Sequence, residues 1–312
     1  MDKYGQTRKP VSEYAIRRRM AGIMIIAQIA AGCAASSPPA SATPPLIVAH
    51  RGSSHSAPEN TLPAYALAWK QNADAGECDI YMSRDGRIMV IHDGDTSRTA
   101  GAALKVKDTE SARLRQLDAG RWKDAKYAGT QIPFLEEIIA GLPVGKRLFV
   151  EIKCGREALP ALRDVIAASG KTPHPPLITL IGFELGTIVE AKAMMPALPA
   201  YWLRGTVMRS GNGKKIPQPH DPAWAVTAKS RGLDGLDVHY EGLTPEFAAA
   251  VKAAGLGLHA WTVDDAAEAQ RLMRLGVDSI TTNRPDFIRE ALGGRDARAP
   301  RTTTDNQPGH NQ

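Results

Sequence analysis

Two apolar runs of the chain end abruptly in a histidine. The run 46–49 is followed by His50 and Arg51, and the sequence RIMVI is followed by His92 and Asp93. An imidazole titrates near neutral pH, so these two histidines suit proton removal and proton delivery. A guanidinium beside an imidazole suits a phosphate ligand. A single His-Arg pair at a strand end, however, is more often a surface accident.

Two further segments alternate charged and apolar residues. Glu77 and Asp79 are two positions apart, and so are Glu151 and Lys153. Side chains alternate along a strand, so the members of each pair point to the same face. Two carboxylates on one face repel each other and are tolerated where a cation lies between them. Taken alone, the acidic pair also fits a solvated strand edge, and the Glu-x-Lys pair fits a simple ion pair.

Four such segments, each beside an apolar run, are harder to dismiss than one. If the fold brings them to one opening, three carboxylates lie beside two imidazoles, one lysine and one arginine. Three carboxylates suit a hard divalent cation, Ca²⁺ or Mg²⁺. Arg51 and Lys153 then suit a phosphate group near that cation.

The body of the chain alternates short apolar runs with segments of helical periodicity. The expected strands are 46–49, 77–81, 88–91, 148–152, 177–181, 200–203, 233–238, 256–261 and 279–281. The expected helices are 62–71, 135–139, 158–168, 185–194, 245–254 and 266–275. Strands this apolar are buried on both faces, as in parallel sheets, and about 250 residues is the size of an α/β TIM-type (β/α)8 barrel. A doubly wound open sheet is the second possibility.

Nine strand-like runs are one too many for such a barrel. The suspicious link is YMSRDGRIMVIHD, where Ser83-Arg84-Asp85-Gly86 signals a tight turn and leaves no room for a helix. We therefore expect either that one βα unit lacks its helix or that one run lies outside the barrel. We also expect an insertion after the third strand, over residues 94–131, that shapes the substrate pocket.

The two ends of the chain differ in composition from this body. Residues 1–33 resemble an export signal: a basic stretch precedes MAGIMIIAQIAAGC, which is too short to span a membrane stably. Its last four residues resemble a lipoprotein box with Cys33 as the lipidated residue, although simple secretion is the alternative and Met20 could be the start. Residues 34–45 form a Pro/Ser/Ala-rich tether, 46–292 the barrel domain and 293–312 a disordered tail. We expect an exported protein, periplasmic or at the cell surface, anchored to the membrane only through its N-terminal lipid.

Composition excludes some classes of protein. With 312 residues, 43% hydrophobic and 23% charged, the chain is globular. Its net charge of +6 comes without a Lys/Arg stripe interleaved with aromatics, which argues against nucleic-acid binding. Three cysteines make neither a disulfide framework nor a zinc site. No feature of the sequence indicates a protein partner.

Taken together, these motifs resemble those of the glycerophosphodiester phosphodiesterases. The resemblance rests on His50-Arg51-Gly52, Pro58-Glu59-Asn60-Thr61, Glu77 with Asp79, Ser83-Arg84-Asp85-Gly86, His92-Asp93 and Glu151 with Lys153. Later segments, QLDAG, IPFLEEII, AWTVDD and GVDSITTNRPD, extend it over residues 46–288. The family implies a TIM-type barrel and metal-dependent hydrolysis of a glycerophosphodiester to an alcohol and glycerol 3-phosphate.

The resemblance also assigns roles to individual residues. It implies that the metal ligands are Glu77, Asp79 and Glu151, that the acid–base pair is His50 and His92, and that the substrate contacts are Arg51, Lys153 and Trp261. The nucleophile is either a water or the glycerol 2-hydroxyl. We favour His50 as the base and His92 as the acid.

Three functions remain open at this stage. The first is hydrolysis of small glycerophosphodiesters, and the second is a lysophospholipase-D-like activity, which an apolar rim in the mostly polar segment 94–131 would favour. The third is a non-catalytic surface binding barrel, which loss of a catalytic histidine or acidic ligand would favour; none is lost. Asp264 and Asp265 fit a helix N-cap and first-turn charge.

Overall fold

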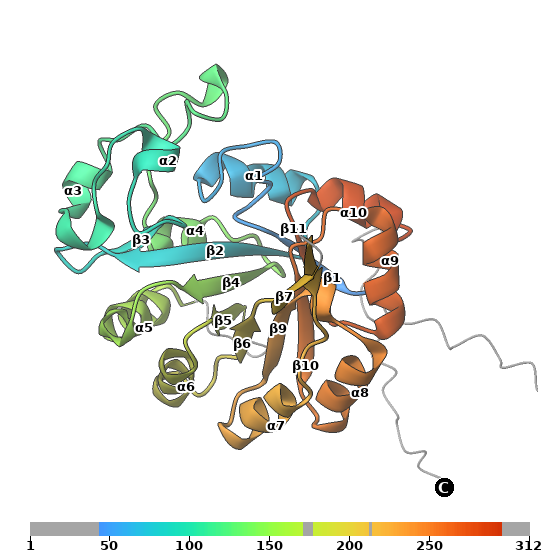
Figure 1. Ribbon diagram of the computed structural model, residues 1–312. Coiled ribbons are helices and arrows are strands. Elements are labelled where there is room, and N and C mark those ends of the chain that lie inside the picture. The colour runs from blue at the N-terminus through green and yellow to red at the C-terminus, as the bar shows by residue number, and fades with distance from the viewer. Residues whose placement is uncertain (1–43, 171–176, 212–213, 295–312) are drawn as a thin grey trace, which may run out of the picture. The chain divides into compact units, whose positions relative to one another are not determined.

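The computed structural model describes residues 44–170, 177–211 and 214–294. The predicted export signal, Cys33 and most of the predicted tether and tail lie outside these residues. In the described part of the chain, eight parallel strands form a closed barrel (Figure 1). They are β1 (Leu46–Ala49), β2 (Ala75–Met82), β4 (Arg147–Ile152), β5 (Ile178–Gly182), β6 (Ala200–Arg204), β9 (Gly235–His239), β10 (Gly257–Trp261) and β11 (Ser279–Thr282).

Pairing between the first two barrel strands closes the sheet. The strand order is β1-β11-β10-β9-β6-β5-β4-β2, and β1 also pairs with β2. This closure confirms the predicted TIM-type barrel over the open sheet. The ninth run is β3 (Ile88–Val90), which pairs antiparallel with β2 through the tight turn and lies outside the barrel.

A helix follows every barrel strand and packs on the outside of the sheet (Figure 1). These helices are α1 (Leu62–Lys70), α4 (Leu135–Ala140), α5 (Leu159–Ala168), α6 (Leu185–Met194), α7 (Ala223–Ser230), α8 (Pro245–Ala253), α9 (Ala266–Leu275) and α10 (Pro285–Ala291). The sequence prediction missed α7 and α10. The buried residues of α7 are only Ala225 and Ala228, so it lacks a marked apolar stripe, and α10 has only seven residues.

Two excursions leave this repeating pattern. After β3 the chain forms α2 (Ser97–Ala100), α3 (Ser111–Leu114) and the 3-10 turns η1 (Val106–Asp108) and η2 (Ala125–Tyr127). Val106 of η1 and Leu114 of α3 pack with Met89 of β3 in a small separate core. After β6 it forms a hairpin of β7 (Met208–Gly211) and β8 (Lys214–Pro217). Single 3-10 turns, η3 (Arg156–Ala158) and η4 (Tyr240–Gly242), precede α5 and α8.

The main hydrophobic core lies between the strands and the surrounding helices. Alternation within each strand sends one set of side chains, such as Leu236 and Val238 of β9, into this core. The opposite set points into the barrel, where Val48, Phe149 and Leu203 pack together. Polar side chains among this second set therefore face the barrel interior, and they form the site described below.

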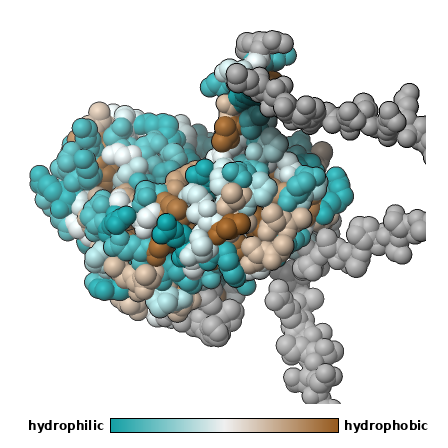
Figure 2. All heavy atoms as spheres, turned by 60° about the horizontal axis from the view of Figure 1, so that its bottom comes forward, coloured by the Kyte–Doolittle hydropathy of each residue, from teal (hydrophilic) through white to brown (hydrophobic). Residues whose placement is uncertain are grey.

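The outer surface is mostly hydrophilic on the face shown in Figure 2, with small, separate hydrophobic patches. Exposed large hydrophobic side chains include Val207, Met208 and Ile216, on and beside the β7–β8 hairpin. Among the described residues, no helix combines the length and the apolar character needed to cross a bilayer.

Candidate active site

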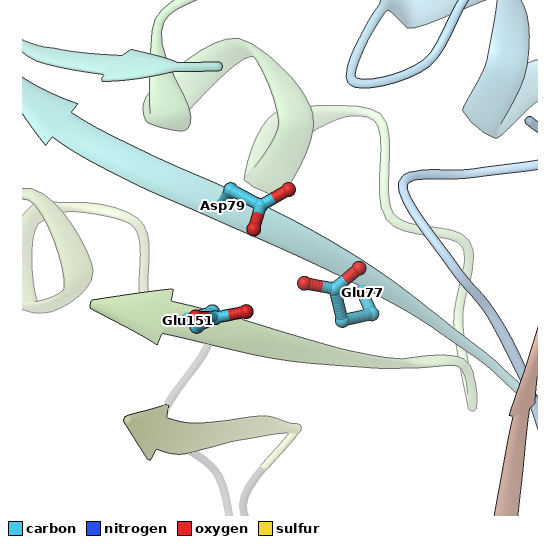
Figure 3. Close-up of side chains that lie close together, drawn as sticks. All are labelled: Glu77, Asp79 and Glu151. Carbon is cyan, nitrogen blue, oxygen red and sulfur yellow. The ribbon is translucent and has the colours of Figure 1, made fainter. Parts of the chain in front are cut away.

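Three carboxylates converge at the barrel interior. Glu77 and Asp79 come from β2 and Glu151 from β4, and one oxygen of each lies within 4.8 Å of the others (Figure 3). The register explains the convergence, because Asp79 is paired directly with Glu151 across the two strands. All three residues are buried. The predicted ligand set is therefore assembled by two neighbouring strands.

Glu77 and Asp79 each have one oxygen that is hydrogen-bonded within the protein and one that is not. Glu77 Oε2 accepts a hydrogen bond of 2.9 Å from the backbone N–H of Arg51, and Asp79 Oδ2 accepts one of 2.8 Å from Asn60 Nδ2. Glu77 Oε1 and Asp79 Oδ1 are buried and have no hydrogen-bond partner. Buried carboxylate oxygens without a partner are costly unless they bind a cation. The residues thus fit a hard divalent ion.

Burial and mutual repulsion raise the pKa values of two of the three carboxyl groups. Burial, reinforced by Asp79 and Glu151, raises the pKa of Glu77 well above its ordinary value. Burial and Asp79 raise the pKa of Glu151 to about 7. Without a cation the cluster therefore tends to hold protons, and a cation that binds there has to displace them.

The His-Arg-Gly segment forms a sharp turn over the cluster. Arg51 and Gly52 have φ angles of 55° and 80°, in the left-handed region. A Cβ on Gly52 would lie 2.7 Å from the backbone of Ala64, so only glycine fits there. The turn aims the guanidinium of Arg51 at Asp79, with Nε 3.1 Å from Oδ2, and at Glu59, with Nη1 2.9 Å from Oε1.

A chain of hydrogen bonds fixes the orientation of His50. Asn283 Nδ2 donates to Asp264 Oδ2 at 2.6 Å, so its Oδ1 faces His50 Nδ1 at 2.7 Å and also accepts from Ser54 Oγ. An amide oxygen only accepts, so His50 Nδ1 carries the proton and Nε2 keeps the lone pair. Burial, together with Arg51, lowers the pKa of His50 to about 4. His50 is therefore a neutral imidazole at neutral pH.

His92 has different partners. Its Nδ1 lies 2.7 Å from Asp93 Oδ1, and its Nε2 lies 3.1 Å from Lys153 Nζ. A carboxylate only accepts, so Nδ1 donates to Asp93 and Nε2 faces the ammonium group of Lys153 as an acceptor. Lys153 Nζ also lies 3.1 Å from Glu151 Oε1 and 3.7 Å from Asp79 Oδ1. The lysine thus links the second histidine to the carboxylates.

These groups line one cavity of about 270 Å³. Its lining residues are His50, Arg51, Glu77, His92, Glu151, Lys153, Ile181, Phe183, Leu203, Asp237, Trp261, Thr262 and Thr281. Trp261 and Phe183 meet edge to face in the wall, with ring centroids 5.6 Å apart. The structure thus brings together every site residue that the sequence predicted within the described part of the chain, with Asp79 joining through the carboxylate cluster.

The sequence prediction missed several residues of the site. Asp237 could have been predicted as a site residue, because an acidic residue between the apolar Leu236 and Val238 is unusual in a buried strand. Asn283 lies in the predicted family segment GVDSITTNRPD but had been given no role. Asp264 is not a helix cap as expected, because it binds Asn283, while Asp265 does cap α9.

The predicted insertion contacts the surroundings of the cavity without lining it. None of the residues 94–131, all of which the structure describes, lines the cavity. The insertion instead supports the rim: Arg98 binds Glu59 and Asp93, and Lys123 Nζ donates to the backbone carbonyl of Ser54 at 2.7 Å. The insertion therefore acts on the cavity only through residues that flank it.

A TIM barrel whose cavity gathers an acidic cluster, two histidines, an arginine and a lysine fits a hydrolase, and the acidic cluster could bind a metal ion. Residues 50–287 match the model of the glycerophosphoryl diester phosphodiesterase family. The chain belongs to this family, which confirms the resemblance inferred from the motifs, and it is a phosphodiesterase of the hydrolase class.

Similar proteins agree with this assignment. The glycerophosphodiester phosphodiesterase of Bacillus subtilis is 30% identical over 264 residues, covering 80% of this chain and 87% of its own. That of Caldanaerobacter subterraneus is 31% identical over 247 residues, covering 78% and 96%. A solved phosphodiesterase of Oleispira antarctica, in complex with the product sn-glycerol-3-phosphate, is 30% identical with a TM-score of 0.71, covering 80% and 96%.

Proposed function

We propose that this protein hydrolyses glycerophosphodiesters to an alcohol and glycerol 3-phosphate with the help of one divalent cation. The observation that carries the proposal is the buried cluster of Glu77, Asp79 and Glu151, with two unpartnered oxygens, in the same cavity as two histidines. The bound sn-glycerol-3-phosphate in the Oleispira antarctica relative supports this choice of product.

Glu77, Asp79 and Glu151 would hold the cation, and three carboxylates without sulfur or imidazole ligands favour Ca²⁺ or Mg²⁺. A bound divalent cation supplies Lewis-acid polarisation of a phosphate oxygen. The protein's own part is to hold the three carboxylates in place against their mutual repulsion. The Arg51 backbone holds Glu77, Asn60 holds Asp79, and Lys153 pairs with Glu151.

Arg51 and Lys153 bind the phosphate group of the substrate. Both line the cavity, and both side chains are only 17% exposed, so their charges are poorly screened by solvent. In the structure each is paired with a carboxylate of the site, which keeps it aimed at the cavity. They offset negative charge on the phosphate as the transition state forms.

His50 acts as the general base and His92 as the general acid. The hydrogen bond to Asn283 leaves His50 neutral with a lone pair on Nε2, which is the state a base needs. Asp93 accepts from Nδ1 of His92 and so directs Nε2 toward Lys153, which leaves Nε2 as the nitrogen that can act on the leaving group. Binding of phosphate by Lys153 would draw its Nζ from His92 Nε2, so that this nitrogen can take up a proton from solvent and deliver it to the leaving alkoxide.

We also propose that the protein is exported and anchored through a lipid on Cys33. The proposal rests on the basic and apolar pattern of residues 1–33. Expression of the full chain and of a Cys33→Ser variant, followed by detergent partition and mass measurement of the N-terminal peptide, tests it. A soluble wild-type protein with an unmodified Cys33 would contradict it.

The enzymatic proposal is tested with the purified full chain, Ca²⁺ or Mg²⁺, and a panel of glycerophosphodiesters and lysophospholipids. The expected result is release of glycerol 3-phosphate from the small diesters. Preferential release of choline or ethanolamine from lysophospholipids, leaving lysophosphatidic acid, would establish the lysophospholipase-D-like activity instead. No turnover with either class and either ion would contradict the proposal.

A further inference from the structure

Asp237 is a buried acidic residue that has no role in the mechanism proposed above. It lies in the middle of β9, where its neighbours Leu236 and Val238 point outward into the main core. Its own side chain points into the barrel and lines the cavity. Asp237 is only 2% exposed, and its Oδ1 has no hydrogen-bond partner.

An unpartnered carboxyl group in this position costs stability. Burying a polar atom without a hydrogen bond is unfavourable, and a leucine would fill the same space without that cost. Asp237 is not part of the three-carboxylate group whose oxygens lie within 4.8 Å of one another. The carboxyl group is thus suited to a neutral polar ligand.

The burial of the lining residues shows which end of the cavity is closed. Ile181, Leu203 and Thr281, which line the cavity with Asp237, are at most 4% exposed. Phe183, by contrast, is 45% exposed and marks the open end. Asp237 therefore contributes a carboxyl group to the closed part of the cavity, and unlike Glu77 it lies outside the three-carboxylate cluster.

The proposed substrates share one half and differ in the other. All carry glycerol phosphate, whereas the esterified alcohol varies. A closed end suits the constant part, and the open end suits the variable part. With the phosphate at Arg51 and Lys153, the terminal hydroxyl of the glycerol is the substrate group that reaches furthest from the phosphate into the closed end.

We propose that Asp237 hydrogen-bonds the terminal hydroxyl of the substrate's glycerol and so selects glycerol over shorter or less hydroxylated groups. This inference rests on the proposed function and deepens it. The hydroxyl supplies the partner that Oδ1 lacks within the protein. A site built to bind a hydroxyl discriminates strongly against a ligand without it, because its own polar group is then left unpaired.

The test compares two diesters of the same alcohol. One contains glycerol; the other contains propane-1,2-diol, which keeps the hydroxyl next to the ester and lacks the terminal one. Wild-type protein should prefer the glycerol diester in kcat/KM by roughly 10- to 100-fold, the range for one hydrogen bond to a buried carboxyl group. Asp237→Leu should lose most of this preference by slowing on the glycerol diester alone, and Asp237→Asn should keep part of it.

Two controls separate this effect from a general defect. Asp164→Leu makes the same change on the exposed face of α5 and should alter neither rate. Calorimetric titration should show the same Ca²⁺ or Mg²⁺ affinity in wild type and Asp237→Asn. The variant should bind glycerol 3-phosphate more weakly than wild type does. Both proteins should bind propane-1,2-diol 1-phosphate equally well.

An equal loss on both diesters, or a loss of metal affinity, would overturn the role of Asp237 while leaving the proposed function intact. An absence of wild-type preference between the diesters would do the same. If the wild-type protein hydrolyses neither diester, the proposed function itself fails and this inference fails with it.

Discussion

Replacing Glu151 with glutamine should remove a pH dependence from the stability of the metal-free protein and should reduce the stability that a bound cation adds. Glu151 lies with Glu77 and Asp79 in the carboxylate cluster, and its pKa is raised to about 7 from 4.5 by burial and by Asp79. A group whose pKa is higher in the folded state contributes stability that is fully present below about pH 4.5. That contribution is lost as the pH rises through about 7.

The size of this effect follows from the change in pKa. One pKa unit corresponds to 1.36 kcal/mol, so a pKa moved from 4.5 to about 7 is worth about 3 kcal/mol in total. Between pH 5 and pH 8, the metal-free wild type should lose about 2 to 3 kcal/mol of stability relative to Glu151→Gln, which cannot titrate. The pKa of about 7 already includes the favourable charge of Lys153, so the ion pair needs no separate term in this comparison.

The assay is urea unfolding of both proteins in chelator at pH 5 and pH 8, then at pH 8 with Ca²⁺. A ligand at a hundredfold excess over its Kd adds about 2.7 kcal/mol to the wild type, and Glu151→Gln should gain clearly less. Parallel pH dependence of the two metal-free proteins would refute the argument that the cluster is electrostatically crowded. An equal gain from Ca²⁺ would refute Glu151 as a ligand.

The remaining predictions concern the histidines, their support and the turn beside them. His50→Ala and His92→Ala should each lower kcat by roughly 10²- to 10⁴-fold at unchanged melting temperature; near-normal turnover in either would remove it from the acid–base pair. Asn283→Ala should lower kcat by on the order of 10- to 100-fold through His50, with KM and metal affinity little changed; a change confined to KM would contradict that role. Gly52→Ala should destabilise the protein in urea unfolding by about 1–3 kcal/mol more than Gly86→Ala does. Both glycines have a φ of +80°, but only a Cβ at position 52 meets other atoms. Equal losses of stability in the two variants would contradict the steric argument.

Much of the barrel could be predicted from the sequence, because its strands are short apolar runs bounded by polar residues. The prediction of Glu77, Asp79 and Glu151 as neighbours also followed from local rules. Alternation fixed the faces of β2 and β4, and strand ends in a barrel converge on one mouth. The ninth run could not be placed from the sequence, because a tight turn is compatible both with a missing helix and with the antiparallel β3 that the structure shows.

The missed parts of the site depend on contacts distant in sequence. Asn283 binds a histidine 233 positions earlier, and no local pattern indicates that pairing. The insertion is polar and follows a strand of the site, which suggested a pocket wall. Its apolar residues instead pack with Met89, Ile91 and Ile132 in a small separate core. Side chains such as Arg98 and Lys123 contact residues around the cavity.

The central claim is that three carboxylates hold a divalent cation that hydrolysis requires. The most direct measurement is release of glycerol 3-phosphate from a glycerophosphodiester by the metal-stripped full chain, as Ca²⁺ or Mg²⁺ is added back, for wild type, Glu77→Gln and Glu290→Gln. Glu290 is an exposed glutamate of α10 and serves as the matched control. Activity should be absent without metal, return in wild type and Glu290→Gln, and stay low in Glu77→Gln. Full activity in chelator, or an equal return of activity in Glu77→Gln, would contradict the account.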